Sequence, residues 1–156
     1  ENMNSWLKFS NLCRQTYKPK LAQTTLINLL TDELIGSFKE GSFKPSMLLT
    51  AKDAPREVVC AYFEHMWGVG DKAEAFSLMS EYVSKMQAIS NPAHLSLKSK
   101  GYLTLGKWQQ QLQKDCSSNE HKRTVILQNL QLATQFDPGS HEAWHAWALF
   151  NQKIAE

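Results

Sequence analysis

The spacing of apolar residues between Val59 and Trp67 constrains the fold more than any other feature of the sequence. Apolar side chains stand at positions 59, 62, 63, 66 and 67, which is the i, i+3, i+4, i+7, i+8 pattern of one helix face. Glu64 and His65 fall off that face. Pro55 precedes the segment at a position typical of a helix start, and glycines follow it as a stop. The sequence therefore predicts an amphipathic helix over 55–68.

Helix-period patterns extend along the rest of the chain, whereas no segment alternates with period two for long. One face of a first helix is expected to carry Trp6, Phe9, Leu12 and Cys13. Ser117-x-x-Glu120 is expected to form a capping box. The predicted fold class is all-α, with antiparallel helices near 5–16, 19–31, 55–68, 71–90, 92–105, 120–136 and 140–155.

Two stretches interrupt the helical pattern. Residues 32–54 are rich in glycine, serine and lysine and contain the tandem strings Gly36 to Lys39 and Gly41 to Lys44, so they are expected to form an irregular insertion. Residues 107–119 are expected to form a shorter one. The phenylalanines of the first stretch would suit the docking of a partner, and the alternative is a plain surface loop.

Helix starts recur along the chain in the manner of a helical repeat with insertions, and Gly70 to Ala75 matches the turn between the two helices of a tetratricopeptide-like pair. The chain is thus expected to be a single helical-repeat segment over 1–156. Small alanines at 22, 75, 133 and 143 would let facing helices approach. The expected structural repeat positions are Trp6, Ala22, Trp67, Ala75, Trp108, Trp144 and Trp147.

Composition limits the class of protein. The longest apolar run, Val58 to Phe63, is far shorter than the roughly 20 residues of a membrane-spanning helix, so no direct membrane insertion is expected. Seventeen basic against fifteen acidic residues give a net charge of +2, so binding to nucleic acid is not implied. Three widely separated cysteines favour a reducing compartment. Neither end carries a signal peptide or a helix terminator, which is typical of a piece of a longer chain.

One string resembles a metal motif. His141, Glu142 and His145 read H-E-x-x-H, which on a helix can hold zinc with the glutamate as base. A catalytic zinc needs a third protein ligand, and Asn151 stands where the metzincin spacing would place a histidine. The match is interpreted as chance, with no metal site and no catalytic residue expected. A zinc hydrolase stays an alternative that rests on these residues only.

Four strings resemble the late FAT region of target-of-rapamycin (TOR) kinases, within the phosphatidylinositol-3-kinase-related family. They are Trp6 to Cys13, Met66-Trp67, Leu105 to Gln109 and Ala143 to Ala148. The resemblance implies an α-solenoid of antiparallel tetratricopeptide-like helix pairs that wraps and braces the lobes of a serine/threonine kinase.

The resemblance also implies a role. The expected function is that of a non-catalytic scaffold in a growth and nutrient signalling complex, so this segment is not expected to be an enzyme. Its implied partners are the kinase domain of the same chain and other subunits of a TOR-like complex. The implied location is cytoplasmic, with endomembrane or nuclear positions through the parent complex. The alternative is a stand-alone tetratricopeptide adaptor that binds a peptide in its concave groove.

Several members of the kinase class bind inositol hexakisphosphate in a basic pocket of the FAT solenoid. By resemblance, Lys8 and Lys100 stand where basic pocket residues stand, whereas Gln15, Gly68, Thr104 and Glu142 stand at other pocket positions. Fewer cations and an added carboxylate disfavour a polyanion. No cofactor is therefore expected, and Lys8 and Lys100 are the candidate polyanion-binding residues.

Overall fold

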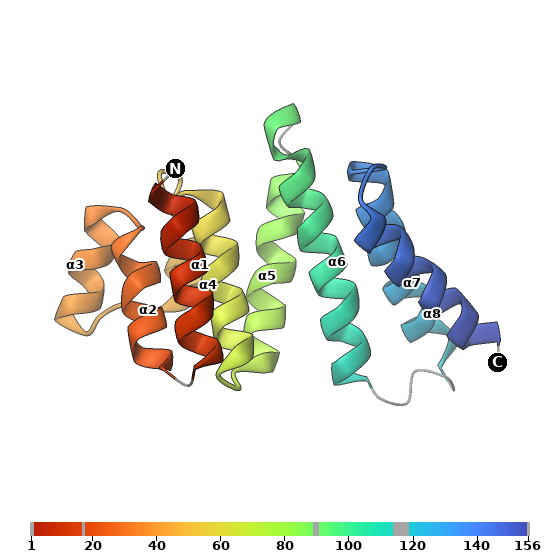
Figure 1. Cartoon of the computed structure of the whole chain (residues 1–156), viewed down its shortest axis with the longest axis horizontal. Helices are drawn as coiled ribbons and strands as arrows, with labels where there is room; N and C mark the ends of the chain where they lie inside the picture. Colours follow the sequence, from red (N-terminus) through yellow and green to blue (C-terminus); the bar gives the residue numbers. More distant parts are fainter. Residues whose placement is uncertain (1, 17, 89–90, 114–118, 156) are drawn as a thin grey trace. The chain divides into compact units, whose positions relative to one another are not determined.

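Helices make up the regular structure of the computed structural model, which describes residues 2–16, 18–88, 91–113 and 119–155. No strand occurs among these residues, so the prediction of an all-α fold is confirmed. None of the described helices is long and apolar enough to cross a membrane. In chain order (Figure 1) the helices are α1 (Asn2–Gln15), α2 (Pro19–Asn28), α3 (Asp32–Glu40), the 3-10 helix η1 (Pro45–Leu49), α4 (Arg56–Gly68), α5 (Lys72–Gln87), the 3-10 helix η2 (Pro92–His94), α6 (Leu95–Leu112), α7 (Glu120–Phe136) and α8 (His141–Ala155).

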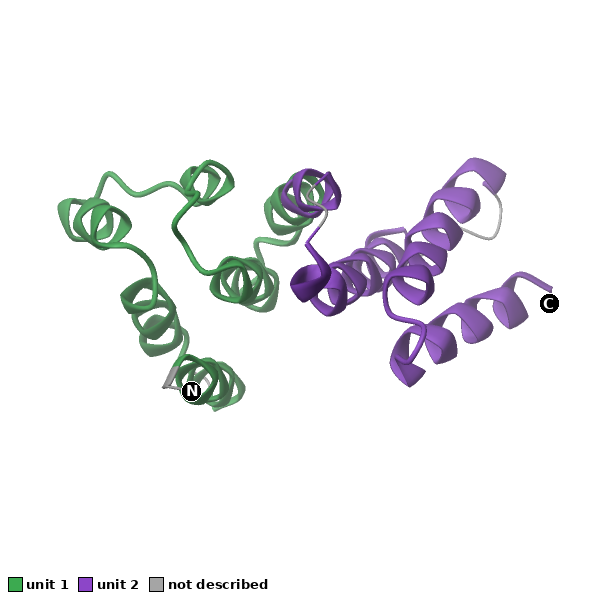
Figure 2. Cartoon of the chain, turned by 90° about the horizontal axis from the view of Figure 1, so that it is seen from above, with its two compact units in different colours: residues 1–81 green, residues 82–156 purple. Residues whose placement is uncertain are grey.

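Two compact units divide the chain (Figure 2). Unit 1 covers residues 1–81 and unit 2 covers residues 82–156, so the boundary falls within α5. Each unit has its own buried apolar core.

The core of unit 1 forms where α1, α2 and α4 pack together, with α1 and α2 as an antiparallel pair (Figure 1). Ala22 has no exposed surface, and its carbonyl oxygen accepts a 3.1 Å hydrogen bond from Ser10 Oγ. Val59 and Phe63, on the predicted face of α4, also have no exposed surface. The predicted amphipathic helix is therefore confirmed, and its apolar face supplies the centre of this core.

The turn after α4 is also as predicted. Gly70 has a positive φ of 109°, a conformation that glycine adopts without steric cost. The backbone N–H of Asp71 donates to the carbonyl oxygen of Met66 at 3.0 Å. The chain therefore reverses direction within a few residues and enters α5.

The core of unit 2 depends on a close approach between α6 and α7. Gly106 lies so near Leu130 that an added Cβ would stand 2.6 Å from Leu130 Cδ2. Ser99 Oγ donates a 2.7 Å hydrogen bond to the carbonyl oxygen of Ala133, whose side chain is fully buried. α8 packs on both helices. Small residues thus allow the backbones of α6 and α7 to come together.

The expectation of an irregular insertion over 32–54 is wrong where α3 and η1 form. α3 has acidic residues in its first turn and buries Leu34, and it ends at Gly41, whose φ is 78°. Acidic residues stabilise a helix N-terminus and a left-handed glycine ends a helix. The glycine and serine content of this stretch therefore marks the end of a helix.

The expectation of an irregular stretch over 107–119 is wrong for its first half, because α6 continues to Leu112. Trp108 is only 6% exposed, and this burial outweighs the weak local pattern. The N-terminus of α7 is capped by Asn119, whose Oδ1 accepts a hydrogen bond from the backbone N–H of Lys122 at 3.2 Å. The expected cap, Ser117, lies outside the described residues.

The expected inward face of α1 is wrong in three of its four positions. Cys13 is 4% exposed, but Trp6, Phe9 and Leu12 are 49%, 40% and 54% exposed. α1 packs on α2 and α4 through the side that carries Ser10 and Cys13. The stripe of Trp6, Phe9 and Leu12 consequently borders the buried side of α1 and is left about half exposed at the edge of the core of unit 1.

Candidate functional site

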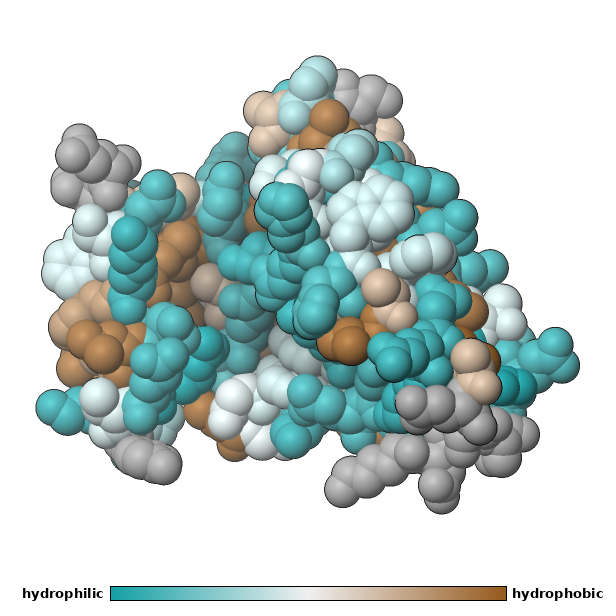
Figure 3. Space-filling view, turned by 45° about the vertical axis from the view of Figure 1, so that its right-hand side comes forward, coloured by the Kyte–Doolittle hydropathy of each residue, from teal (hydrophilic) through white to brown (hydrophobic). Residues whose placement is uncertain are grey.

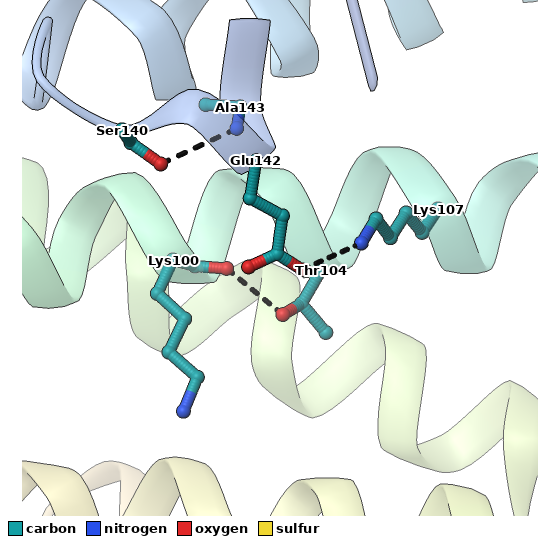
Figure 4. Close-up of polar contacts among 6 residues, drawn as sticks. All are labelled: Lys100, Thr104, Lys107, Ser140, Glu142 and Ala143. Atoms are coloured by element: carbon teal, nitrogen blue, oxygen red, sulfur yellow. Dashed lines mark hydrogen bonds and ion pairs between the residues drawn. The ribbon is translucent and has the colours of Figure 1, made fainter. Parts of the chain in front are cut away.

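The two candidate polyanion-binding lysines belong to different units. Lys8 is exposed on α1 in unit 1, and Lys100 is exposed on α6 in unit 2. Thr104, another position named by the resemblance, uses its hydroxyl to donate a 2.8 Å hydrogen bond to the carbonyl oxygen of Lys100. Figure 4 shows the Lys100 ammonium extending away from the Thr104 hydroxyl.

The carboxylate of Glu142 is occupied by a lysine of the same unit. Lys107 Nζ lies 2.9 Å from Glu142 Oε1 (Figure 4). This hydrogen bond, together with the charge of Lys107 and more weakly that of Lys100, holds the pKa of Glu142 below its ordinary value. The pair joins two exposed side chains of unit 2, Lys107 on α6 and Glu142 on α8.

The H-E-x-x-H string lies at the start of α8. His141, Glu142 and His145 are all exposed, and Glu142 is paired with Lys107. Over the described ranges, no group of three or more histidine, cysteine, aspartate or glutamate side chains is placed to hold a metal ion. Ser140 Oγ accepts a 3.3 Å hydrogen bond from the backbone N–H of Ala143, so the string forms the capped first turn of a helix.

A cavity of about 520 Å³ lies within unit 1 and is a further candidate site. We call it the unit 1 cavity. It is lined by the first turn of α2, the end of α3, the residues up to Pro45, the C-terminal half of α4, and the start of α5. Its size is in the range of small-ligand sites.

One wall of the unit 1 cavity is a row of aromatic rings. The ring centroids of Phe38 and Phe43 are 6.0 Å apart, those of Phe43 and Tyr62 5.7 Å, and those of Tyr62 and His65 6.1 Å. Phe38 and Phe43 come from the stretch whose phenylalanines were expected to suit docking. The folded segment thus brings both rings to a cavity instead of leaving them on a loop.

Two polar side chains of the unit 1 cavity, Tyr62 and His65, come from α4. Gln23 Nε2 donates a 3.0 Å hydrogen bond to Tyr62 Oη. His65 is 4% exposed, and its Nδ1 has no hydrogen-bond partner. Burial, and next the charge of Arg14, lower the pKa of His65. The imidazole is therefore neutral at pH 7.

Tyr62 is likewise held in its neutral form. Burial raises the pKa of its phenol, and the negative charges of Asp71 and Glu74 add to this effect, although the hydrogen bond from Gln23 opposes it. Asp71 and Glu74 both line the cavity. The cavity thus combines aromatic rings, neutral polar atoms and two carboxylates.

The sequence of the whole chain matches a known protein family. The FAT domain family model matches residues 1–156, which is the whole chain. The chain belongs to the FAT domain family. FAT domains are helical-repeat solenoids and lie outside the kinase domain, so this FAT segment is non-catalytic.

Curated relatives of this FAT segment are TOR kinases. Serine/threonine-protein kinase mTor of Drosophila melanogaster is 28% identical over 165 residues, or 100% of this chain. TOR2 of Saccharomyces cerevisiae is 30% identical over 171 residues, or 95% of the chain, and TOR of Arabidopsis thaliana is 25% identical over 170 residues, or 99% of it. The chain spans about 6% of the length of these relatives.

Sequence reasoning missed most of the unit 1 cavity of this FAT segment. His65 was expected on the polar side of its helix, which is wrong, because α3, the following turn and the start of α2 also cover α4. The hydrogen bond between Gln23 and Tyr62 joins residues 39 positions apart. A contact between residues so far apart cannot be predicted from the local sequence pattern. The two phenylalanines were the available signal.

Proposed function

We propose that this FAT segment is a helical scaffold of a TOR-like serine/threonine kinase, which braces the kinase lobes and presents surfaces to other subunits of a signalling complex. The FAT match over the whole chain and the kinase identity of the relatives support this proposal. The buried cysteines Cys13 and Cys60 are consistent with a reducing, cytoplasmic location. The full-length match favours a scaffold over a stand-alone adaptor.

The observation that carries the scaffold proposal is the exposed apolar stripe of α1. Trp6, Phe9 and Leu12 recur every third residue on one side of the helix, and the rings of Trp6 and Phe9 meet edge to face at 5.8 Å. On the face shown in Figure 3, hydrophobic side chains likewise form separate patches within a mostly hydrophilic surface. Contiguous exposed apolar surface is typical of contact sites, and the parent kinase supplies the partner for this stripe.

α8 carries a second exposed apolar surface, at Trp144, which is 45% exposed. The indole N–H of Trp144 donates a 2.8 Å hydrogen bond to the carbonyl oxygen of Pro138, so this ring is held in place. A fixed, half-exposed indole is well suited to a protein contact. We propose that this surface also packs within the parent assembly.

The proposal is tested by placing one charge on the stripe. Leu12→Asp is compared with Ser5→Asp, which puts the same charge on an exposed polar position of the same helix. Because Leu12 is already half exposed, the melting temperature of the 156-residue chain is expected to change little. In the parent kinase, Leu12→Asp is expected to reduce kinase activity more than Ser5→Asp does. Equal activities for the two variants would contradict a bracing role for this surface.

A further inference from the structure

The lining of the unit 1 cavity includes a histidine with a buried hydrogen-bonding atom that the chain itself does not use. His65 is 4% exposed, lines the cavity, and leaves Nδ1 without a partner. Buried polar atoms are nearly always hydrogen-bonded. A neutral imidazole with its proton on Nε2 offers Nδ1 as an acceptor. An unpaired acceptor in a cavity calls for a ligand that supplies an N–H or O–H donor.

The aromatic row next to His65 selects the charge of that ligand. Phe43 stands edge to face against Phe38 on one side and Tyr62 on the other, with interplanar angles of 71° and 74°. The faces of such rings carry negative charge and attract cations. A cationic group that enters the cavity is therefore favoured over a neutral or anionic one.

Two carboxylates also favour a cationic ligand in the unit 1 cavity. Asp71 and Glu74 line the cavity, against a single ammonium, that of Lys20. Arg14 faces His65 from α1, but it does not line the cavity. Its Nη2 donates to Asn11 Oδ1 at 2.5 Å, and its side chain lies over Gly68. The charge that lines the cavity is thus negative on balance.

We propose that the unit 1 cavity binds the guanidinium group of an arginine side chain presented by a partner polypeptide. The planar group stacks on the ring of Phe43, and Tyr62, whose ring stands at 74° to that of Phe43, meets its edge. Its N–H groups donate to the carboxylates at the start of α5, and to His65 Nδ1 once the imidazole turns toward the cavity, because Nδ1 is buried as it stands. Arginine fits better than lysine because its planar, fork-shaped head stacks on aromatic rings and donates in several directions at once.

The apolar part of the cavity accommodates the stem of that arginine. Met66 is 4% exposed and Val69 is 45% exposed, so the lining passes from buried to open along one side. Long basic side chains cover apolar surface with their methylene groups while the charged head reaches polar partners. The inference goes beyond the scaffold proposal and does not depend on it, because it concerns the lining of one unit.

The test uses the 156-residue chain and four blocked pentapeptides of the form Gly-Gly-X-Gly-Gly, in which X is arginine, citrulline, lysine or leucine. Citrulline keeps the shape of arginine and removes its charge. Binding is followed by amide chemical shifts and by calorimetry. The arginine peptide is expected to bind about tenfold more tightly than the citrulline peptide, and also more tightly than the lysine and leucine peptides. Shift changes are expected at His65 and Tyr62.

Three variants locate the site. Glu74→Gln removes a lining carboxylate and Phe43→Leu removes a ring while it keeps an apolar side chain, so each is expected to weaken arginine binding severalfold. Glu57→Gln removes the same charge at the exposed start of α4, about 12 Å along the helix from His65, and is expected to leave binding unchanged. Circular dichroism checks that each variant is folded.

Several outcomes would overturn the proposal. Equal binding of the arginine and citrulline peptides would show that charge has no role, and equal binding of the leucine peptide would show a purely apolar pocket. Equal losses of arginine-peptide affinity in Glu74→Gln and Glu57→Gln would show that the peptide responds to the overall negative charge of the surface and not to a defined site. None of these outcomes changes the expected effect of Leu12→Asp on the parent kinase, so the two proposals fail separately.

Discussion

Gly106→Ala tests how tightly α6 and α7 are packed. The added Cβ would stand 2.6 Å from Leu130 Cδ2 and 3.0 Å from its Cγ. Leu130 has no exposed surface, so its side chain has no open space into which it can turn. Forcing an extra carbon into a well-packed core costs about 1–3 kcal/mol. The change from glycine to alanine inside a helix returns about 1 kcal/mol. We therefore expect a net loss of about 0–2 kcal/mol.

The matched control is Gly36→Ala. Gly36 lies within α3, and a Cβ built there has no atom within 4 Å. The helix-propensity gain of about 1 kcal/mol is then not offset by a clash. The Gly36→Ala variant is therefore expected to be more stable than the unchanged 156-residue chain. The two glycine-to-alanine changes should consequently differ by about 1–3 kcal/mol in their effect on the free energy of unfolding. Gly36→Ala is expected to raise it, and Gly106→Ala is not.

The assay is urea unfolding, followed by far-ultraviolet circular dichroism and tryptophan fluorescence. Buried Trp108 lies in α6 and reports on unit 2. In a Leu130→Ala background, which itself costs about 2–5 kcal/mol, Gly106→Ala is expected to become stabilising because the clashing atoms are gone. An increase in stability from Gly106→Ala alone, equal to that from Gly36→Ala, would refute the close approach of the two helices.

Three further predictions concern the polar residues. The folded-state pKa of His65 is lowered from 6.5, so the unfolded chain takes up that proton first. The contribution of the neutral imidazole to the free energy of unfolding is therefore lost as the pH falls below about 6.5. In His65→Gln we expect a flatter pH dependence of stability, and an unchanged slope would contradict a buried neutral imidazole. The chain is expected to lose zinc on dialysis against a weak chelator, and stoichiometric zinc that His145→Ala abolishes would show otherwise. Inositol hexakisphosphate is expected to bind weakly at about 0.15 M salt, and submicromolar calorimetric binding that depends on Lys8 or Lys100 would contradict the charge argument.

The helices that sequence predicted best are those whose apolar period, start and stop agree. α4 and α7 begin and end within one residue of the predicted bounds, because Pro55 and the glycines frame the first, and a polar start and Asp137-Pro138-Gly139 frame the second. Alanines 22, 75, 133 and 143 all have no exposed surface. Close packing leaves this kind of signal in the sequence because only small side chains fit.

Features set by neighbours far along the chain were not predictable. α3 was hidden by Gly36 and by its serine, and it exists because Leu34 is buried. How far the α1 stripe is covered depends on where α2 and α4 meet α1, and the helical period alone cannot give the extent of that cover. The unit 1 cavity needs residues of four helices, so no single stretch carries its pattern.

Hydrogen exchange of α1 tests the scaffold account most directly. The measurement compares amide exchange along Asn2–Gln15 in the 156-residue chain and in the parent kinase. If the stripe of Trp6, Phe9 and Leu12 packs within the kinase, the amides of α1 are expected to exchange more slowly in the parent. Exchange of α1 at the same rate in both proteins would contradict the claim that this segment is built into the kinase as a packed scaffold.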